Sequence, residues 1–177
     1  PMPSPVSTSS PGPRTLIVMR HAKSDWSVPV EDRLRPLNRR GRRQAAEAGR
    51  WLAAHAGRIG LAVVSPAVRA ADAWRLAAAE LLAPPPERVD ERAYTDDGED
   101  LLAIVRGLGA AAAEAGVGRG GTVVLVSHSP ACAELVELLT GEVIEMKTSG
   151  LAVVELEPDG PARGRLVTSR RPPTAPH

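Results

Sequence analysis

Residues 16–26 read LIVMRHAKSDW, and the rest of the fold can be worked out from this segment. Four consecutive apolar residues (16–19) predict a buried strand over 15–20, because a strand covered on both faces is apolar at successive positions. The strand ends on Arg20 and His21, two polar side chains that a buried strand does not require. We therefore expect this pair to lie at the carboxyl end of a strand and to face something other than the core.

An apolar run followed by polar residues recurs twice along the chain. Residues 61–65 (LAVVS) lead into SPAVRA at 65–70, and residues 122–127 (TVVLVS) lead into SHSP at 127–130. Apolar residues at helical spacing separate these strands. Helices are predicted over 38–56, 66–83, 100–115 and 130–141. The second of these ends at the sequence PPP, and the last ends at Gly141. Two further strands are predicted at 151–156 and 163–169, on either side of a hairpin-like turn.

This alternation of strands and helices predicts an α/β fold of three layers, α/β/α, around a mostly parallel sheet. The last two strands have no helix between them, which predicts one antiparallel edge strand. Residues 14–169 are predicted to form a single domain. Residues 1–13 and 170–177, which are rich in Pro and Ser or Thr and lack periodicity, are predicted to be disordered tails.

Composition argues against several functional classes. A net charge of +1 and an aromatic content of 2% argue against a nucleic-acid partner. The one cysteine, Cys132, cannot form an internal disulfide. No apolar run approaches the ~18 residues that span a bilayer, so we expect no membrane partner. The first 14 residues lack the apolar core of a secretory signal, which predicts a cytoplasmic protein.

The three polar segments are predicted to face one crevice, because ligands of open α/β sheets bind outside the carboxyl ends of the strands. Arg20 and Arg69 would bring two guanidinium groups to it. Ser65 and Ser129, each followed by proline, are predicted N-caps, so two helix amino-termini would also point there. Guanidinium groups bind phosphate oxygens through paired hydrogen bonds. The sequence therefore predicts an anion site, although capping alone explains each Ser-Pro pair.

His21 and His128 would give this anion site a chemical use, since a neutral imidazole can attack a phosphoryl group as a nucleophile. The neighbouring arginines disfavour the imidazolium form of His21. A backbone carbonyl behind His21 is one way to fix its tautomer, and His128 can donate a hydrogen bond to the transferred group. A zinc site is disfavoured, because the arginines would repel a cation and no third ligand is evident.

At these residues the chain resembles the histidine phosphatase superfamily, whose hallmark is an Arg-His-Gly sequence at the end of the first strand. More narrowly, it resembles the SixA-type phosphohistidine phosphatases, which are small members without a large helical cap. Two positions depart from the family pattern: Ala22 replaces the glycine, and Ala73 stands where many relatives carry threonine. The resemblance runs from Leu16 to Leu156 through RHAKSDW (20–26), RPLNRRGRRQA (35–45), SPAVRA (65–70), VSHSP (126–130) and TSGLAVVEL (148–156).

The resemblance implies the phosphoglycerate mutase-like fold with a minimal cap. It implies that His21 is the phosphorylated nucleophile, that Arg20 and Arg69 hold phosphate, and that His128 completes the pocket. It implies no metal and no organic cofactor. Arg35, at the crevice rim, and Ser129, beside His128, are further candidates for substrate binding.

An acidic residue that protonates the leaving oxygen has no clear counterpart, and Asp25, Glu91 and Asp96 remain open as candidates. An alkoxide needs such a donor, whereas imidazole can leave neutral after taking a proton from solvent. This difference favours phosphoramidates such as phosphohistidine, acyl phosphates or phenolic esters over sugar phosphates as substrates.

Residues 33–43 (RLRPLNRRGRR) contain six arginines and no acidic residue. They form either a solvated surface or a docking patch for an acidic phosphoprotein. Three functions remain open for the whole chain, which we expect to be a monomer. It is a phosphatase of phosphohistidine proteins such as a histidine-containing transfer domain, a phosphatase of small phosphorylated molecules, or a catalytically silent phosphate-binding module.

Overall fold

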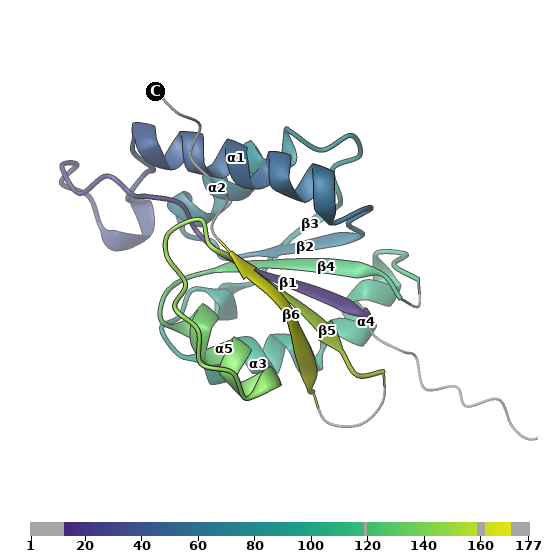
Figure 1. The fold of residues 1–177 in the computed structure, drawn as a ribbon. Coiled ribbons are helices and arrows are strands. Elements are labelled where there is room, and N and C mark those ends of the chain that lie inside the picture. Colours follow the sequence, from purple (N-terminus) through teal and green to yellow (C-terminus); the bar gives the residue numbers. More distant parts are fainter. Residues whose placement is uncertain (1–12, 119, 159–161, 171–177) are drawn as a thin grey trace, which may run out of the picture.

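A six-stranded sheet forms the middle of the computed structural model, which describes residues 13–118, 120–158 and 162–170 (Figure 1). The strand order across the sheet is β3-β2-β4-β1-β5-β6. The predicted strands are confirmed to within one residue at each end. The strands are β1 (Thr15–Arg20), β2 (Leu61–Val64), β3 (Glu87–Val89), β4 (Thr122–Ser127), β5 (Leu151–Leu156) and β6 (Gly164–Arg170).

The sheet is mostly parallel, as predicted. β1 pairs in parallel with β4, β4 with β2, and β2 with β3. The antiparallel edge consists of two strands: β5 runs against β1, and β6 runs against β5. The sequence did not indicate β3, because all three of its residues are exposed and give no apolar run.

Helices cover both faces of the sheet, which confirms the three layers (Figure 1). Because side chains alternate along a strand, Ile17 and Met19 of β1 pack with the helices on one face, and Leu16 and Val18 pack with those on the other. The first face carries α1 (Arg39–His55) and α2 (Val68–Ala78), and the second carries α3 (Gly98–Arg106), α4 (Leu108–Glu114) and α5 (Ala131–Thr140).

Two of the predicted helices differ in extent. The helix predicted at 66–83 is the shorter α2, which ends well before the prolines, and Leu82 beyond it is fully exposed and adds no packing. The helix predicted at 100–115 begins at Gly98 and is divided at Gly107, a residue of low helix propensity, into α3 and α4. The other two match to within one residue, and Gly141 closes α5 in the left-handed conformation.

Two short 3-10 helices, η1 (Asp32–Leu34) and η2 (Glu91–Ala93), were not predicted. The predicted tails lie largely outside the described residues, and so do residues 159–161 of the hairpin-like turn. None of the described helices is long and apolar enough to cross a membrane.

Candidate active site

The polar segments that follow β1, β2 and β4 meet at one edge of the sheet. Arg20 is paired with Ser127 in the sheet register, and the backbone N–H of His21 donates to the carbonyl of Ser127 at 3.0 Å. A pocket of about 230 Å³ opens at this edge. All six predicted site residues line it, namely Arg20, His21, Arg35, Arg69, His128 and Ser129.

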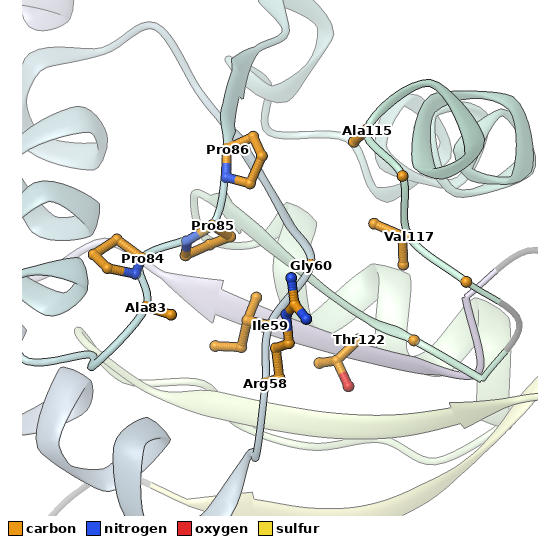
Figure 2. Close-up of a pocket in the computed structure, with 13 residues that line it drawn as sticks. Arg58, Ile59, Gly60, Ala83, Pro84, Pro85, Pro86, Ala115, Val117 and Thr122 are labelled. Atoms are coloured by element: carbon orange, nitrogen blue, oxygen red, sulfur yellow. The ribbon is translucent and has the colours of Figure 1, made fainter.

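The opposite edge of the sheet carries a different kind of pocket. This second pocket, of about 360 Å³, lies at the amino ends of β2, β3 and β4, among residues 58–60, 83–86, 115–118, 121 and 122 (Figure 2). Three consecutive prolines form part of its wall, and Arg58 is the charged side chain in its described lining. The described lining of this second pocket therefore contains no histidine, cysteine or carboxylate.

His21 and His128 are neighbours in the first pocket. Their ring centroids lie 5.1 Å apart, and the ring planes are inclined by 55°. The Nδ1 atom of His21 lies 2.7 Å from the carbonyl oxygen of Ala22. Because a carbonyl can only accept, Nδ1 carries the hydrogen and donates it. In the neutral ring, Nε2 therefore keeps its lone pair, which is the condition for a nucleophile.

Both histidines are held in the neutral form. The pKa of His21 is lowered to about 3, mainly by burial; His128, Arg69 and Arg20 lower it further, while the hydrogen bond to Ala22 opposes the shift. The pKa of His128 is lowered to about 4, again mainly by burial and then by Arg69. The predicted effect of the arginines is present, but removal from water is the larger cause.

Ser65 contacts His128 instead of capping a helix. Its Oγ lies 2.7 Å from Nε2 of His128 and accepts the N–H of Ala67 at 3.3 Å. The prediction of Ser65 as an N-cap is wrong, because α2 begins two residues later with Ala67 at the cap. The prediction for Ser129 is also wrong, since Pro130 stands at the cap of α5. In both segments the turn through Ser-Pro separates the serine from the helix.

The arginines line the pocket from different elements. Arg20 at the end of β1 donates from Nη1 to the carbonyl of Met146 at 3.0 Å. Arg69, the second residue of α2, donates from Nη1 to the backbone carbonyl of Asp32 at 2.6 Å and from Nη2 to Oδ2 of Asp32 at 3.0 Å. Arg35 forms an ion pair with Oδ1 of the same carboxylate and stacks over the ring of Trp26, 3.6 Å from its centroid.

Sequence reasoning missed Asp32 and Tyr94. The Tyr94 hydroxyl donates to Oδ2 of Asp32 at 2.5 Å, and its ring centroid lies 5.4 Å from that of His128. Asp32 lies three residues before Arg35, a spacing that was available as a signal for the ion pair. Tyr94 follows η2, and no periodic pattern marks its position.

The three candidate acids are in different situations. Asp25 accepts hydrogen bonds from the backbone N–H and the hydroxyl of Ser27. Glu91 forms an ion pair with Arg33 at 2.7 Å. Neither Asp25 nor Glu91 lines the pocket. Asp96 does line it. The hydrogen bond from Tyr94 and the charge of Arg69 lower the pKa of Asp32 to about 2, so Asp32 is ionised at neutral pH and is not a proton donor.

The arginines of the basic run at 33–43 differ in their exposure to solvent. Arg35 is buried in the pocket, whereas Arg39, Arg40 and Arg43 are exposed on the first turns of α1. Among the residues that the structure describes, no three His, Cys, Asp or Glu side chains are grouped as metal ligands would be.

The fold and the site together define a class: an α/β protein with two buried neutral histidines and several arginines around one anion-sized pocket at the carboxyl ends of parallel strands. Residues 16–94 match the model of the histidine phosphatase superfamily, branch 1. This match covers β1, β2 and η2 and includes His21 and Arg69. Over these residues the chain is similar to the histidine phosphatase superfamily, and this similarity supports phosphatase activity.

Solved structures agree with this assignment. The protein histidine phosphatase SixA complexed with tungstate is 25% identical, with a TM-score of 0.75 over 89% of this chain and 97% of that one. A protein from Agrobacterium tumefaciens assigned to SixA is 26% identical, with a TM-score of 0.73 over 90% and 99%. A mycobacterial glucosyl-3-phosphoglycerate phosphatase, at 22% identity and a TM-score of 0.66 over 88% and 98%, shares the fold. No curated protein matches the chain by sequence.

Proposed function

We propose that this protein is a phosphatase that acts through a covalent phosphohistidine intermediate on His21 and removes phosphate from phosphohistidine on signalling proteins. The observation that carries the proposal is the state of His21. Its Nδ1–H is held by the Ala22 carbonyl at 2.7 Å, and its pKa is about 3. A ring in this state presents the Nε2 lone pair to the pocket at neutral pH without needing a base.

Catalysis takes two displacements. In the first, Nε2 of His21 bonds to phosphorus while the bond from phosphorus to the leaving group breaks. In the second, water attacks phosphorus, and the bond to Nε2 breaks to release phosphate. Arg20 and Arg69 neutralise the equatorial oxygens, and His128 donates a hydrogen bond to one of them.

The carboxylates of the pocket favour a leaving group that needs no proton donor. Asp32 is ionised at neutral pH, because its pKa is about 2. Asp96 is exposed at the pocket wall. Imidazole can leave without help, whereas an alkoxide cannot. This asymmetry supports phosphohistidine over a sugar phosphate.

The surface around the pocket supports a protein substrate. Trp26, Val30 and Leu34 are exposed large apolar side chains. Along the sequence, each of them lies within nine residues of both Asp32 and Arg35, which line the pocket. Such exposed apolar groups beside a polar site are typical of protein contacts. The exposed arginines at 39, 40 and 43 follow directly along the chain and would complement an acidic partner.

The proposal is tested by incubating the protein with a 32P-phosphorylated histidine-containing transfer domain, quenching, and mapping the label. We expect an acid-labile label on His21 that chases into inorganic phosphate, and no label in His21→Ala. A matched control is His55→Ala, which removes a histidine of α1 whose Nδ1 bonds the Trp51 carbonyl away from the pocket. Retention of phosphate binding without turnover would identify a silent binding module, and faster turnover of sugar phosphates would identify a small-molecule phosphatase.

A further inference from the structure

Asp32 holds a position in the pocket that the two displacements do not use. Its carboxylate contacts Arg35 through one oxygen, and Arg69 and Tyr94 through the other. A carboxylate placed against two anion-binding arginines weakens their attraction for phosphate. The position of Asp32 beside these arginines is therefore not explained by phosphate binding.

The exposed fractions of these side chains show that Asp32 reaches solvent, whereas the two arginines that it contacts are buried. The side chains of Arg35 and Arg69 are each 9% exposed, whereas that of Asp32 is 49% exposed. His21, the attacking group, is buried. In an in-line displacement the leaving group lies on the side of phosphorus opposite to the nucleophile. Because His21 is buried, the leaving group departs toward solvent, and the half-exposed carboxylate of Asp32 in the pocket lining is accessible to it.

We propose that Asp32 selects the leaving group by accepting the N–H of a phosphorylated imidazole ring, so that the site prefers phosphohistidine to phosphate esters. This inference rests on the proposed function. A phosphorylated imidazole has a second ring nitrogen that can carry a proton, and an adjacent carboxylate stabilises that protonated, cationic ring. An ester has no such donor, and the negative charge that develops on its leaving oxygen is repelled by the same carboxylate.

The step balances without an external acid. Nε2 of His21 forms a bond to phosphorus, the bond from phosphorus to the substrate ring nitrogen breaks, and its electron pair stays on that nitrogen. The proton on the other ring nitrogen, hydrogen-bonded to Asp32, remains there. Imidazole therefore leaves as a neutral molecule, and no group of the protein gains or loses a proton, since Nδ1 of His21 keeps its hydrogen on the Ala22 carbonyl.

Two other functions of Asp32 would produce a different result. The carboxylate could hold Arg69 and Arg35 in place, or it could occupy the anion site until phosphate displaces it. Both act on the phosphoryl group, which every substrate carries. Either one would change the turnover of all substrates by a similar factor, whereas selection of the leaving group changes their ratio.

The test compares phosphoimidazole with p-nitrophenyl phosphate in wild type, Asp32→Asn and Asp72→Asn. Asp72→Asn removes the same charge from α2, where Asp72 pairs with Arg75 at 3.6 Å. We expect Asp32→Asn to lower the ratio of kcat/KM for phosphoimidazole to that for p-nitrophenyl phosphate by at least about tenfold, which corresponds to about 1.4 kcal/mol. We expect the alkaline limb of the phosphoimidazole profile to move to lower pH. Asp72→Asn should leave the ratio unchanged.

An unchanged ratio in Asp32→Asn would overturn the inference, and so would a wild type that turns over p-nitrophenyl phosphate but not phosphoimidazole. Because both substrates are measured on the same preparation, partial unfolding of a variant cancels from the ratio. The proposed function fails separately, if wild type forms no labelled intermediate on His21 with either substrate.

Discussion

His128 lies between the nucleophile and Ser65: its ring centroid is 5.1 Å from that of His21, and its Nε2 is 2.7 Å from Oγ of Ser65. The Nδ1 atom of His128 is buried and has no partner among the described residues. A neutral imidazole carries one hydrogen, so the nitrogen that Ser65 binds determines what the other nitrogen can offer to a phosphoryl oxygen. The orientation and the tautomer of His128 therefore depend on a residue outside the pocket lining.

Ser65→Ala is expected to lower kcat about tenfold and to change KM little, because His128 loses the hydrogen bond that orients it while the arginines still bind phosphate. Steady-state kinetics with p-nitrophenyl phosphate measures both constants. Ser65→Thr, which keeps the hydroxyl, should restore most of kcat. If Ser65→Ala instead raised KM about tenfold and left kcat unchanged, Ser65 would be assigned to substrate binding.

Arg69→Lys is expected to weaken binding of tungstate or inorganic phosphate about 10- to 100-fold, because a lysine is a single point charge and cannot make the paired hydrogen bonds of a guanidinium. Isothermal titration calorimetry measures the dissociation constants. The matched control is Arg75→Lys on the same helix, where the side chain is exposed and pairs with Asp72. Equal dissociation constants for Arg69→Lys and wild type would remove Arg69 from the anion site.

Stability is expected to fall with acidification between about pH 6.5 and pH 3. The pKa of His21 is about 3 and that of His128 about 4, against 6.5 for the free side chain. Between these values the unfolded chain binds more protons than the folded one, so stability is complete above about pH 6.5 and is lost as pH falls. Each unit of pKa difference corresponds to about 1.4 kcal/mol. Urea unfolding at pH 7, 5.5 and 4.5 measures the loss.

The double variant His21→Asn, His128→Asn provides the comparison for this measurement. It lacks both buried imidazoles, so its stability should vary less with pH over the same range. Parallel curves for wild type and the double variant would contradict the assignment of the acid sensitivity to these two rings.

Gly41→Ala is expected to destabilise the protein by about 1–3 kcal/mol, the usual cost of overpacking, and to reduce activity. A methyl group at this position of α1 would overlap the backbone carbonyl of Lys23, which accepts the N–H of Asn38 at 3.0 Å. The strain would reach the loop that carries His21. In Gly107→Ala the nearest atom, the carbonyl oxygen of Ile104, is at an ordinary 3.5 Å, so the change should be small. Denaturant unfolding and kcat distinguish the two.

The predicted fold agrees closely with the structure where the information is local. The apolar runs of β1, β2 and β4 were visible because strands covered by helices on both faces exclude polar residues along their length. The polar ends of these strands could be recognised for the same reason, because Arg20 and His128 interrupt the runs of apolar residues that are typical of buried strands. The edge strand β3 is three exposed residues and gives no such pattern.

The three layers, the end of the sheet at which the site lies, and six of the residues that line its pocket could be predicted from the sequence alone. The groups that contact these six residues could be identified only from the folded structure. Asp32 meets Arg69 across 37 residues and Tyr94 across 62, from short turns that bury no periodic face. The contact of Ser65 with His128 spans 63 residues. Such contacts, and the low pKa values that burial produces, depend on how distant segments pack, which no local pattern encodes.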